Sequence, residues 1–416
     1  MKVAGDPPLH LTYCTNIHPA DGWPGVSANL RTYAPALKQR FSRDAPFGLG
    51  LRLSARDARE LLDGHLDDFA SWLAGEGLYV AILNGFPHGQ FHRTPVKEEV
   101  YAPDWRDPER VRYTRDLIRI VARLVPAGLD AGISTAPLSY KTWMARATGD
   151  EWMTIVRHLV EIAADLVKVR ERDGTLVHLD IEPEPDCVLE TSAETITFFE
   201  QRLLPHGAPL LARTLGISED RARAALLEHI SVCFDCCHFA VEHEDAHEAL
   251  TSLQRAGLRI GRVQLSSALD VHVPASPDAR ARVLDRLRTF ADSTYLHQTV
   301  EADAGELRHY PDLGPAIEAA VNRSGAGAFR THFHVPLYAA SYEELGSTQD
   351  YVRTVIHAAR AQGFTRHLEI ETYTWDVLPA ALKTDLGESI AREYEWTLRE
   401  LRSSKPEARS KLQPEF

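Results

Sequence analysis

The chain has 416 residues and a formal net charge of −13, with 44% hydrophobic and 25% charged residues. These proportions are those of an ordinary globular protein, and they exclude disordered and fibrous classes. The acidic balance repels phosphate backbones and anionic lipid surfaces, so we expect no nucleic-acid partner.

The start of the chain and its cysteines limit the class of protein further. The first ten residues, MKVAGDPPLH, contain no apolar signal-peptide core, and no later run reaches the ~18 apolar residues of a membrane span. We therefore expect a cytoplasmic protein without direct membrane insertion. Five cysteines, an odd number with Cys236 and Cys237 adjacent, do not form a disulfide framework, so we expect reduced thiols.

Short apolar runs alternate with longer segments of helical periodicity, which is the pattern of repeated β/α units and a parallel sheet. Eight runs are predicted as core strands: His10 to Thr15, Phe47 to Leu53, Leu78 to Leu83, Leu129 to Thr135, Leu176 to Ile181, Ile230 to Phe234, Ile260 to Leu265 and His367 to Thr372. Amphipathic segments such as Ala58 to Leu73 and Trp152 to Val169 lie between them. The sequence therefore predicts an α/β fold, a single (β/α)₈ TIM barrel.

Two Ser/Thr-x-x-Glu patterns predict helix starts. Thr191 is followed by Glu194, and Ser341 by Glu344. In such a pattern, the Ser or Thr oxygen and the Glu carboxylate accept hydrogen bonds from the free backbone N–H groups of the first helical turn. We expect a helix to begin after each pattern.

A long segment, 270–337, separates the seventh and eighth predicted strands. It contains one helix-like and two strand-like pieces: Asp278 to Phe290, Tyr295 to Val300 and Phe329 to His334. We interpret it as an elaborated βα loop over the C-terminal face, where barrels carry their active sites. A doubly wound sheet or a small second domain is the alternative. The barrel domain then spans 1–402, and we expect the polar tail 403–416 to be disordered.

The stretch Ser231 to Phe239, SVCFDCCHF, has the pattern of a strand that delivers metal ligands. Asp235 supplies an anionic oxygen and His238 a nitrogen, and a turn that leaves the strand can bring both to one divalent ion. The alternative is a hydrogen-bonded structural pair. Cys236 and Cys237 are expected to pack in the turn rather than to bind a soft metal.

Carboxylates follow the fifth predicted strand, which ends LDIEPEPD. Asp180 and Glu182 lie on one face by the two-residue period, and Glu184 and Asp186 fall in the next loop. All strand C-termini of a barrel open into one mouth, so these groups converge with Asp235. Salt bridges within the loop are the alternative.

The last strands supply further candidates. The eighth strand ends LEIETYTWD and places Glu369 and Glu371 on one face, where one can bind metal and the other can act as a base. The seventh offers Gln264, whose amide is as well suited to a hydrogen bond inside the barrel as to a metal. The segment THFHVPL places His332 and His334 two apart, a spacing that can clamp a metal.

The first four strands end in polar and cationic residues that can hold a substrate. The candidates are Arg52, Asn84, His88 and Lys141. Guanidinium and ammonium groups suit an anionic or hydroxyl-rich ligand. Hydrogen bonds within the loops are the alternative for each of them.

The order of these motifs resembles that of the xylose isomerase-like TIM-barrel superfamily, which includes sugar isomerases, epimerases and endonuclease IV. This resemblance implies metal or near-metal roles for five residues: Glu182, Asp235, His238, His334 and Glu371. Gln264 stands where relatives often place a metal-binding His or Asp, which favours a single divalent ion over a multi-zinc site.

Longer strings resemble the EboE family of metabolite-traffic proteins over nearly the whole chain. They include HLTYCTNIHP, NGFPHGQFH, LDIEPEPDC, CFDCCHFAVEHED and LEIETYTWDVLP. The resemblance implies a small-molecule metabolite as partner, together with other proteins of the same gene cluster. It says little about the chemistry.

The leading hypothesis is a metal-dependent isomerase or epimerase that acts on a small polar metabolite. A divalent ion (Zn, Mn or Mg) polarises a carbonyl, Glu182 or Glu371 acts as the base, and His238 binds the ion or the substrate. The alternatives are a metal-dependent phosphoester hydrolase and a metabolite-binding component of an export system without turnover.

Overall fold

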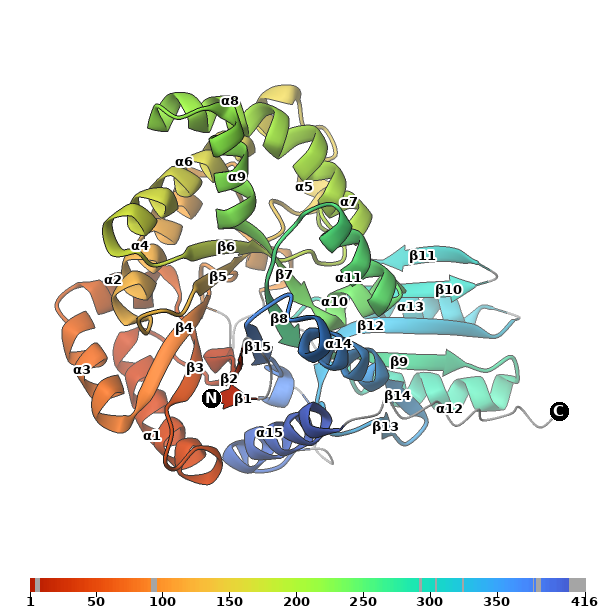
Figure 1. Cartoon of the computed structure of the whole chain (residues 1–416). Helices are drawn as coiled ribbons and strands as arrows, with labels where there is room; N and C mark the ends of the chain where they lie inside the picture. Colours follow the sequence, from red (N-terminus) through yellow and green to blue (C-terminus); the bar gives the residue numbers. More distant parts are fainter. Residues whose placement is uncertain are drawn as a thin grey trace.

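Eight parallel strands form a barrel in the computed structural model, which describes residues 1–3, 8–90, 96–291, 294–303, 305–323, 325–376, 378 and 383–403 (Figure 1). In spatial order they are β3 (Phe47–Arg52), β4 (Leu78–Asn84), β5 (Ala131–Thr135), β6 (Val177–Ile181), β7 (Ile230–Asp235), β8 (Ile260–Leu265), β15 (His367–Ile370) and β2 (Leu9–Tyr13). A parallel bridge between Cys14 and Gly50 closes the ring, and the short β1 (Lys2–Val3) pairs antiparallel with β2 as a ninth strand of this sheet. The predicted TIM barrel is confirmed, and each of the eight predicted runs overlaps a barrel strand.

An ionic network fills the middle of the barrel. The Arg262 guanidinium on β8 lies 3.0 Å from Asp180 Oδ2 and 3.2 Å from Glu369 Oε2, and all three side chains are fully buried. The space is tight, because a Cβ atom on Gly50 would lie 1.6 Å from Glu369 Oε1 and one on Gly261 would lie 2.0 Å from Asp180 Oδ1. In each predicted pair, the carboxylate nearer the start of the strand, Asp180 or Glu369, therefore pairs with Arg262. The second carboxylate, Glu182 or Glu371, lies at the mouth of the barrel.

Helices surround the barrel, as their amphipathic stripes predict. They are α1 (Trp23–Phe41), α2 (Ala55–Leu62), α3 (Leu66–Glu76), α4 (Pro108–Leu124), α5 (Lys141–Met144), α6 (Gly149–Asp173), α7 (Ser192–Phe198), α8 (Leu204–Leu215), α9 (Glu219–His229), α10 (Cys236–Val241), α11 (Ala246–Arg255), α14 (Gln349–Gln362) and α15 (Leu386–Arg402). The segment predicted as one helix from Ala58 to Leu73 is two, because the chain turns at Gly64 with a φ of +89°. None of the described helices is long and apolar enough to cross a membrane.

A second, antiparallel sheet lies beside the barrel and begins directly after β8 (Figure 1). Its strands are β9 (Ser267–Val273), β10 (Thr299–Asp303), β11 (Glu306–Tyr310), β12 (Gly327–Val335), β13 (Ser341–Tyr342) and β14 (Leu345–Ser347), with the helices α12 (Pro277–Arg288) and α13 (Leu313–Val321). The sheet extends beyond both ends of the predicted insertion at 270–337. The division into a barrel domain, 1–402, and an insertion stays a prediction, and the predicted tail lies outside the described residues from position 404 onward.

One predicted helix start is confirmed and the other is wrong. Thr191 and Glu194 form a reciprocal capping box at the start of α7. Ser341 instead begins β13, and the next helix, α14, starts at Gln349. Glu343, with a φ of 57°, lies in the tight turn that pairs Tyr342 with Leu345. The pattern at Ser341 belongs to a hairpin, because strand pairing there supplies the partners that a helix cap would have supplied.

Candidate metal centre

A cavity opens at the C-terminal ends of the barrel strands, and its empty volume, including the open mouth, is about 530 Å³. Its polar lining consists of Asn16, Asn84, Glu182, Glu184, His238, His332, His334 and Glu371. Phe86, Pro87, Val96, Val100, Tyr101, Tyr295, Leu296 and Tyr373 make up most of the remaining lining. The C-terminal ends of the barrel strands contribute residues to this cavity, and so does β12 of the second sheet.

Asp235 ends β7 and serves as the N-cap of α10. Its Oδ1 accepts hydrogen bonds from the N–H groups of Cys237 at 2.8 Å and His238 at 3.1 Å, and from Ser266 Oγ at 2.6 Å. The other oxygen, Oδ2, is buried and has no hydrogen-bond partner among the described residues. One oxygen thus fixes the side chain, and the second remains available to a ligand.

His238 and His334 are oriented by backbone carbonyls. His238 Nδ1 lies 2.9 Å from Pro183 O, and His334 Nδ1 lies 2.9 Å from Glu371 O. A carbonyl only accepts, so each Nδ1 carries the proton and each Nε2 presents a lone pair. Ligand atoms of Asp235, His238 and His334 lie within 4.8 Å of one another, as a shared ion requires.

Glu182 adds a second carboxylate to this group. It directly follows β6, its Oε1 lies 3.9 Å from His238 Nδ1, and its Oε2 is buried without a hydrogen-bond partner in the described part of the chain. Burial, together with the charges of Asp235 and Glu184, raises the pKa of Glu182 well above its usual range. A cation at this point would offset both effects, because it favours the charged carboxylate.

The donor set fits a divalent transition-metal ion. Two carboxylates and two imidazoles are the ligands that zinc and manganese accept, and the orphaned atoms Glu182 Oε2, Asp235 Oδ2 and His334 Nε2 have no competing protein partner among the described residues. Leaving such buried polar atoms unpaired costs free energy.

Glu371 lies beside this group and is held by three amides. Its Oε1 accepts from Asn16 Nδ2 at 2.7 Å and from Asn84 Nδ2 at 3.1 Å, and its Oε2 accepts from Gln264 Nε2. Burial and the charges of Glu182 and Asp235 raise the pKa of Glu371 well above its usual range. The three N–H donors act in the opposite direction, because they stabilise the carboxylate form.

Gln264, predicted as a metal ligand, has both ends of its amide in use. Its Nε2 donates to Glu371, and its Oε1 accepts from the thiol of Cys233, whose Sγ lies 2.6 Å away. Gln264 therefore supports Glu371 by a hydrogen bond and does not line the cavity.

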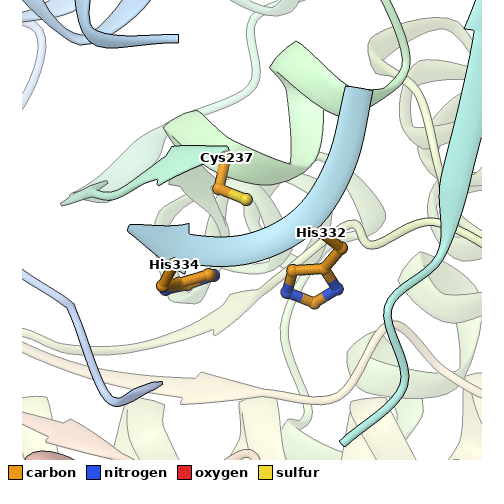
Figure 2. Close-up of side chains that lie close together, drawn as sticks. All are labelled: Cys237, His332 and His334. Carbon is orange, nitrogen blue, oxygen red and sulfur yellow. The ribbon is translucent and has the colours of Figure 1, made fainter. Parts of the chain in front are cut away.

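A second set of possible ligands adjoins the first. Atoms of Glu184, His238 and His332 lie within 4.8 Å of one another, and so do atoms of Cys237, His332 and His334. Figure 2 shows the two imidazoles projecting from β12, with Cys237 on the neighbouring α10. Burial raises the pKa of the Cys237 thiol well above its usual range, which disfavours the thiolate that a metal requires.

The predicted substrate residues separate into two groups. Asn84 lines the cavity, whereas Arg52, His88 and Lys141 do not. Arg52 lies 3.6 Å from Asp57 and donates to Gly89 O, His88 Nε2 lies 3.5 Å from Glu109 Oε1, and Lys141 pairs with Glu190. The structure does not bring these three side chains to the cavity.

Two aromatic residues of the cavity were not predicted from the sequence. Tyr101, at the end of a 3₁₀ turn (Lys97–Tyr101), donates to Glu184 Oε1 at 2.8 Å, and Tyr373 OH lies 3.5 Å from His332 Nε2. Tyr373 stands two residues after Glu371, and the two-residue period of the eighth strand could have indicated it. No pattern around Tyr101 indicates its role, because a loop distant in the sequence brings it there.

No protein-family model and no curated protein matches the chain. Among solved structures, a xylose isomerase-like TIM-barrel protein from Mycobacterium smegmatis in complex with magnesium is 10% identical with a TM-score of 0.50, over 96% of this chain and 98% of that chain. The IOLI protein with a zinc atom is 12% identical with a TM-score of 0.47, over 94% and 98%. D-psicose 3-epimerase with D-tagatose from Clostridium cellulolyticum H10 is 14% identical with a TM-score of 0.37, over 62% and 72%. At these identities the likeness shows the fold alone, a TIM barrel.

Proposed function

We propose that the chain is a divalent-metal-dependent isomerase or epimerase that acts on a small polyhydroxylated carbonyl compound. The convergence of Glu182 Oε2, Asp235 Oδ2 and His334 Nε2, all buried and without hydrogen-bond partners among the described residues, supports the metal most strongly. Glu182, Asp235, His238 and His334 would hold the ion. Two imidazoles favour zinc or manganese over magnesium, although the similar barrel from Mycobacterium smegmatis is in complex with magnesium.

The proposed chemistry is proton transfer beside a carbonyl. When bound, the ion would polarise the substrate carbonyl as a Lewis acid. Glu371 takes the proton from the neighbouring carbon, and the N–H groups of Asn16, Asn84 and Gln264 favour the charged form of its carboxylate against the effect of burial. The sequence assigned Glu371 to both metal and base roles, and its three amide partners favour the base.

The charges around the cavity favour a neutral substrate. Lys97 is the only Lys or Arg among its described lining residues, and the Lys97 Nζ lies 2.6 Å from Asp312 Oδ2. The three buried glutamates of the lining, Glu182, Glu184 and Glu371, would repel a phosphate unless ions covered them. Hydroxyl groups of a substrate can bind the polar lining residues, while the apolar lining residues can contact its carbon skeleton.

Solvent deuterium exchange tests this proposal. Protein loaded with Mn²⁺ or Zn²⁺ is incubated in D₂O with a panel of ketohexoses and cyclic polyol ketones, and NMR follows the C–H signals beside each carbonyl. We expect exchange that chelator abolishes and metal restores, and that Glu371→Gln slows by about 10²-fold or more. Exchange with none of these compounds, or exchange that Glu371→Gln leaves unchanged, contradicts the proposal.

One observation favours a second candidate function, the hydrolysis of a phosphoester. Glu184, His238 and His332 could hold a further ion beside the first, and paired ions are typical of phosphoester hydrolases. Under this alternative, His332→Asn loses one bound ion, whereas under the isomerase proposal it keeps the metal content of the wild type. Membership of the EboE family, with protein partners from the same gene cluster, is also part of our proposal and rests on the sequence strings alone.

A further inference from the structure

Four carboxylates gather beside the barrel mouth without lining the cavity. Asp186 and Glu190 lie in the loop after β6, Glu194 is on α7, and Glu242 directly follows α10. The sequence pattern LDIEPEPD had singled out Asp186, and the proposed reaction does not use it. Two basic side chains accompany these acids, Lys141 at the start of α5 and His309 on β11.

Three of these side chains have the spacing of metal ligands. One ligand atom each from Glu190, Glu242 and His309 lies within 4.8 Å of the other two. His309 Nδ1 lies 3.8 Å from Glu242 Oε2, which is too long for a hydrogen bond. Glu190 and Glu242 belong to the loops of the barrel, whereas His309 belongs to the second sheet, so the cluster lies where the two parts of the molecule meet.

Glu242 is the proposed ligand whose carboxylate keeps a buried oxygen without a hydrogen-bond partner among the described residues, as Asp186 beside it also does. Glu190 accepts from the backbone N–H of Asp186 at 2.7 Å and pairs with Lys141, which also lies 3.7 Å from Glu194. Glu242 is only 3% exposed, and its Oε1 has no hydrogen-bond partner among the described residues. Burial and the neighbouring charges of Glu190 and Asp186 raise the pKa of Glu242 to about 9. A buried carboxylate in this position requires either a proton or a cation.

We propose that Glu190, Glu242 and His309 bind a divalent first-row metal ion, with Zn²⁺ as the best match, and that this ion fastens the β10–β11 hairpin to the barrel. Two carboxylate oxygens and an imidazole are a common zinc donor set, and a solvent molecule can complete the tetrahedron. Lys141 supplies one positive charge to four carboxylates, so the ion adds charge that the cluster lacks. This site is separate from the cavity and does not depend on the proposed reaction.

The variant Glu242→Gln separates a cation from a proton. Glutamine has the shape of protonated glutamate, so it leaves the fold intact if Glu242 carries a proton, and it removes a ligand if Glu242 binds zinc. The full chain is stripped with chelator, titrated with Zn²⁺ alone, and compared with the variant by metal analysis and by thermal unfolding. We expect Glu242→Gln to bind one zinc fewer than the wild type and to show a smaller zinc-induced rise in Tm.

Two histidine variants complete the test. His309→Ala, at the more exposed end of the cluster, should reproduce the loss of one zinc without disturbing the buried acids. His272→Ala, an exposed histidine on β9 of the same sheet, should bind as much zinc as the wild type. The proposal is overturned if both Glu242→Gln and His309→Ala keep the zinc content and the Tm response of the wild type, because Glu242 then carries a proton.

Discussion

The Nδ1 atom of His334 lies 2.9 Å from the backbone carbonyl oxygen of Glu371. This bond joins β12 of the second sheet to the residue that follows β15 of the barrel. It fixes the imidazole so that Nε2 faces Asp235 and His238. Gln264, at the seventh barrel strand, is already bonded to Glu371 and Cys233. In the proposed ligand set, the second sheet therefore contributes a nitrogen donor, and the seventh barrel strand contributes none.

Replacing His334 by asparagine should weaken metal binding selectively. His334→Asn removes Nε2 from the proposed ligand set and keeps a polar side chain, so we expect zinc affinity in the cavity to fall by about tenfold or more. Isothermal titration of chelator-treated protein measures it. His272→Asn, on the exposed face of β9, is the matched control. Equal affinities for the two variants contradict the assignment.

Ser266 should affect the metal through Asp235. Its Oγ lies 2.6 Å from Asp235 Oδ1 and is one of three donors that orient that carboxylate. Loss of such an outer contact typically costs 10–100-fold in metal affinity, and we expect about this loss for Ser266→Ala. The neighbouring Ser267, whose Oγ lies 3.5 Å from Thr348 Oγ1, provides the control Ser267→Ala. If the two variants bind zinc alike, Asp235 does not depend on this hydrogen bond.

Glu393 should make stability depend on pH. Burial raises the pKa of Glu393 to about 8, although the carboxylate accepts from Thr372 Oγ1 at 2.6 Å and from Leu337 N at 3.1 Å. The folded state then binds more protons than the unfolded state between about pH 4.3 and pH 8. The stabilisation from the protonated group is complete below this window and is lost as the pH rises through it.

Glu393→Gln tests this expectation, because glutamine stays neutral and can accept the same hydrogen bonds. Its free energy of unfolding relative to the wild type should rise by up to roughly 1.4 kcal/mol per pH unit between pH 5.5 and 8. Urea unfolding at several pH values measures it, with Glu395→Gln on the exposed side of α15 as control. A difference that does not change with pH would show that Glu393 is ionised throughout.

Arg262 should be essential to the stability of the barrel. Its guanidinium pairs with Asp180 and Glu369 and donates to Leu83 O at 2.9 Å. Arg262→Met leaves the buried Glu369 without a cation and leaves Asp180 with only the His178 imidazole, 2.5 Å away, which costs about 3–5 kcal/mol of unfolding free energy. Adding Asp180→Asn and Glu369→Gln should restore part of this loss, as denaturant unfolding can show. A loss below about 1 kcal/mol contradicts the ionic network.

The sequence contains enough information for the barrel and for the position of its mouth. Each strand is a short buried run, and the two-residue period separates Glu182 from Asp180 and Glu371 from Glu369. Because the barrel strands are parallel, their C-terminal ends bring Glu182 and Glu371 to the same mouth without any specific packing contact. These predictions depend on local periodicity, which the sequence carries directly.

The remaining features depend on contacts between distant residues. The partner of Asp180 and Glu369 is Arg262, on a third strand, and no local pattern couples these positions. Strands β9 and β11 were not predicted, because β11 is polar and largely exposed and β9 directly continues the run of β8. Whether a cation such as Lys141 reaches the cavity depends on nearby acids, and here Glu190 holds it.

The variant Asp235→Asn tests the central claim most directly. In this variant Oδ1 can still accept from Cys237, His238 and Ser266, so only the oxygen without a hydrogen-bond partner among the described residues changes. Asp245→Asn alters an aspartate that caps α11 in the same way, at 2.9 Å from His247 N, and is the control. For protein purified without chelator, we predict that metal analysis finds about one divalent ion fewer in Asp235→Asn than in the wild type and in Asp245→Asn. Equal metal content in all three proteins, with the fold intact by circular dichroism, would contradict a metal centre at this site.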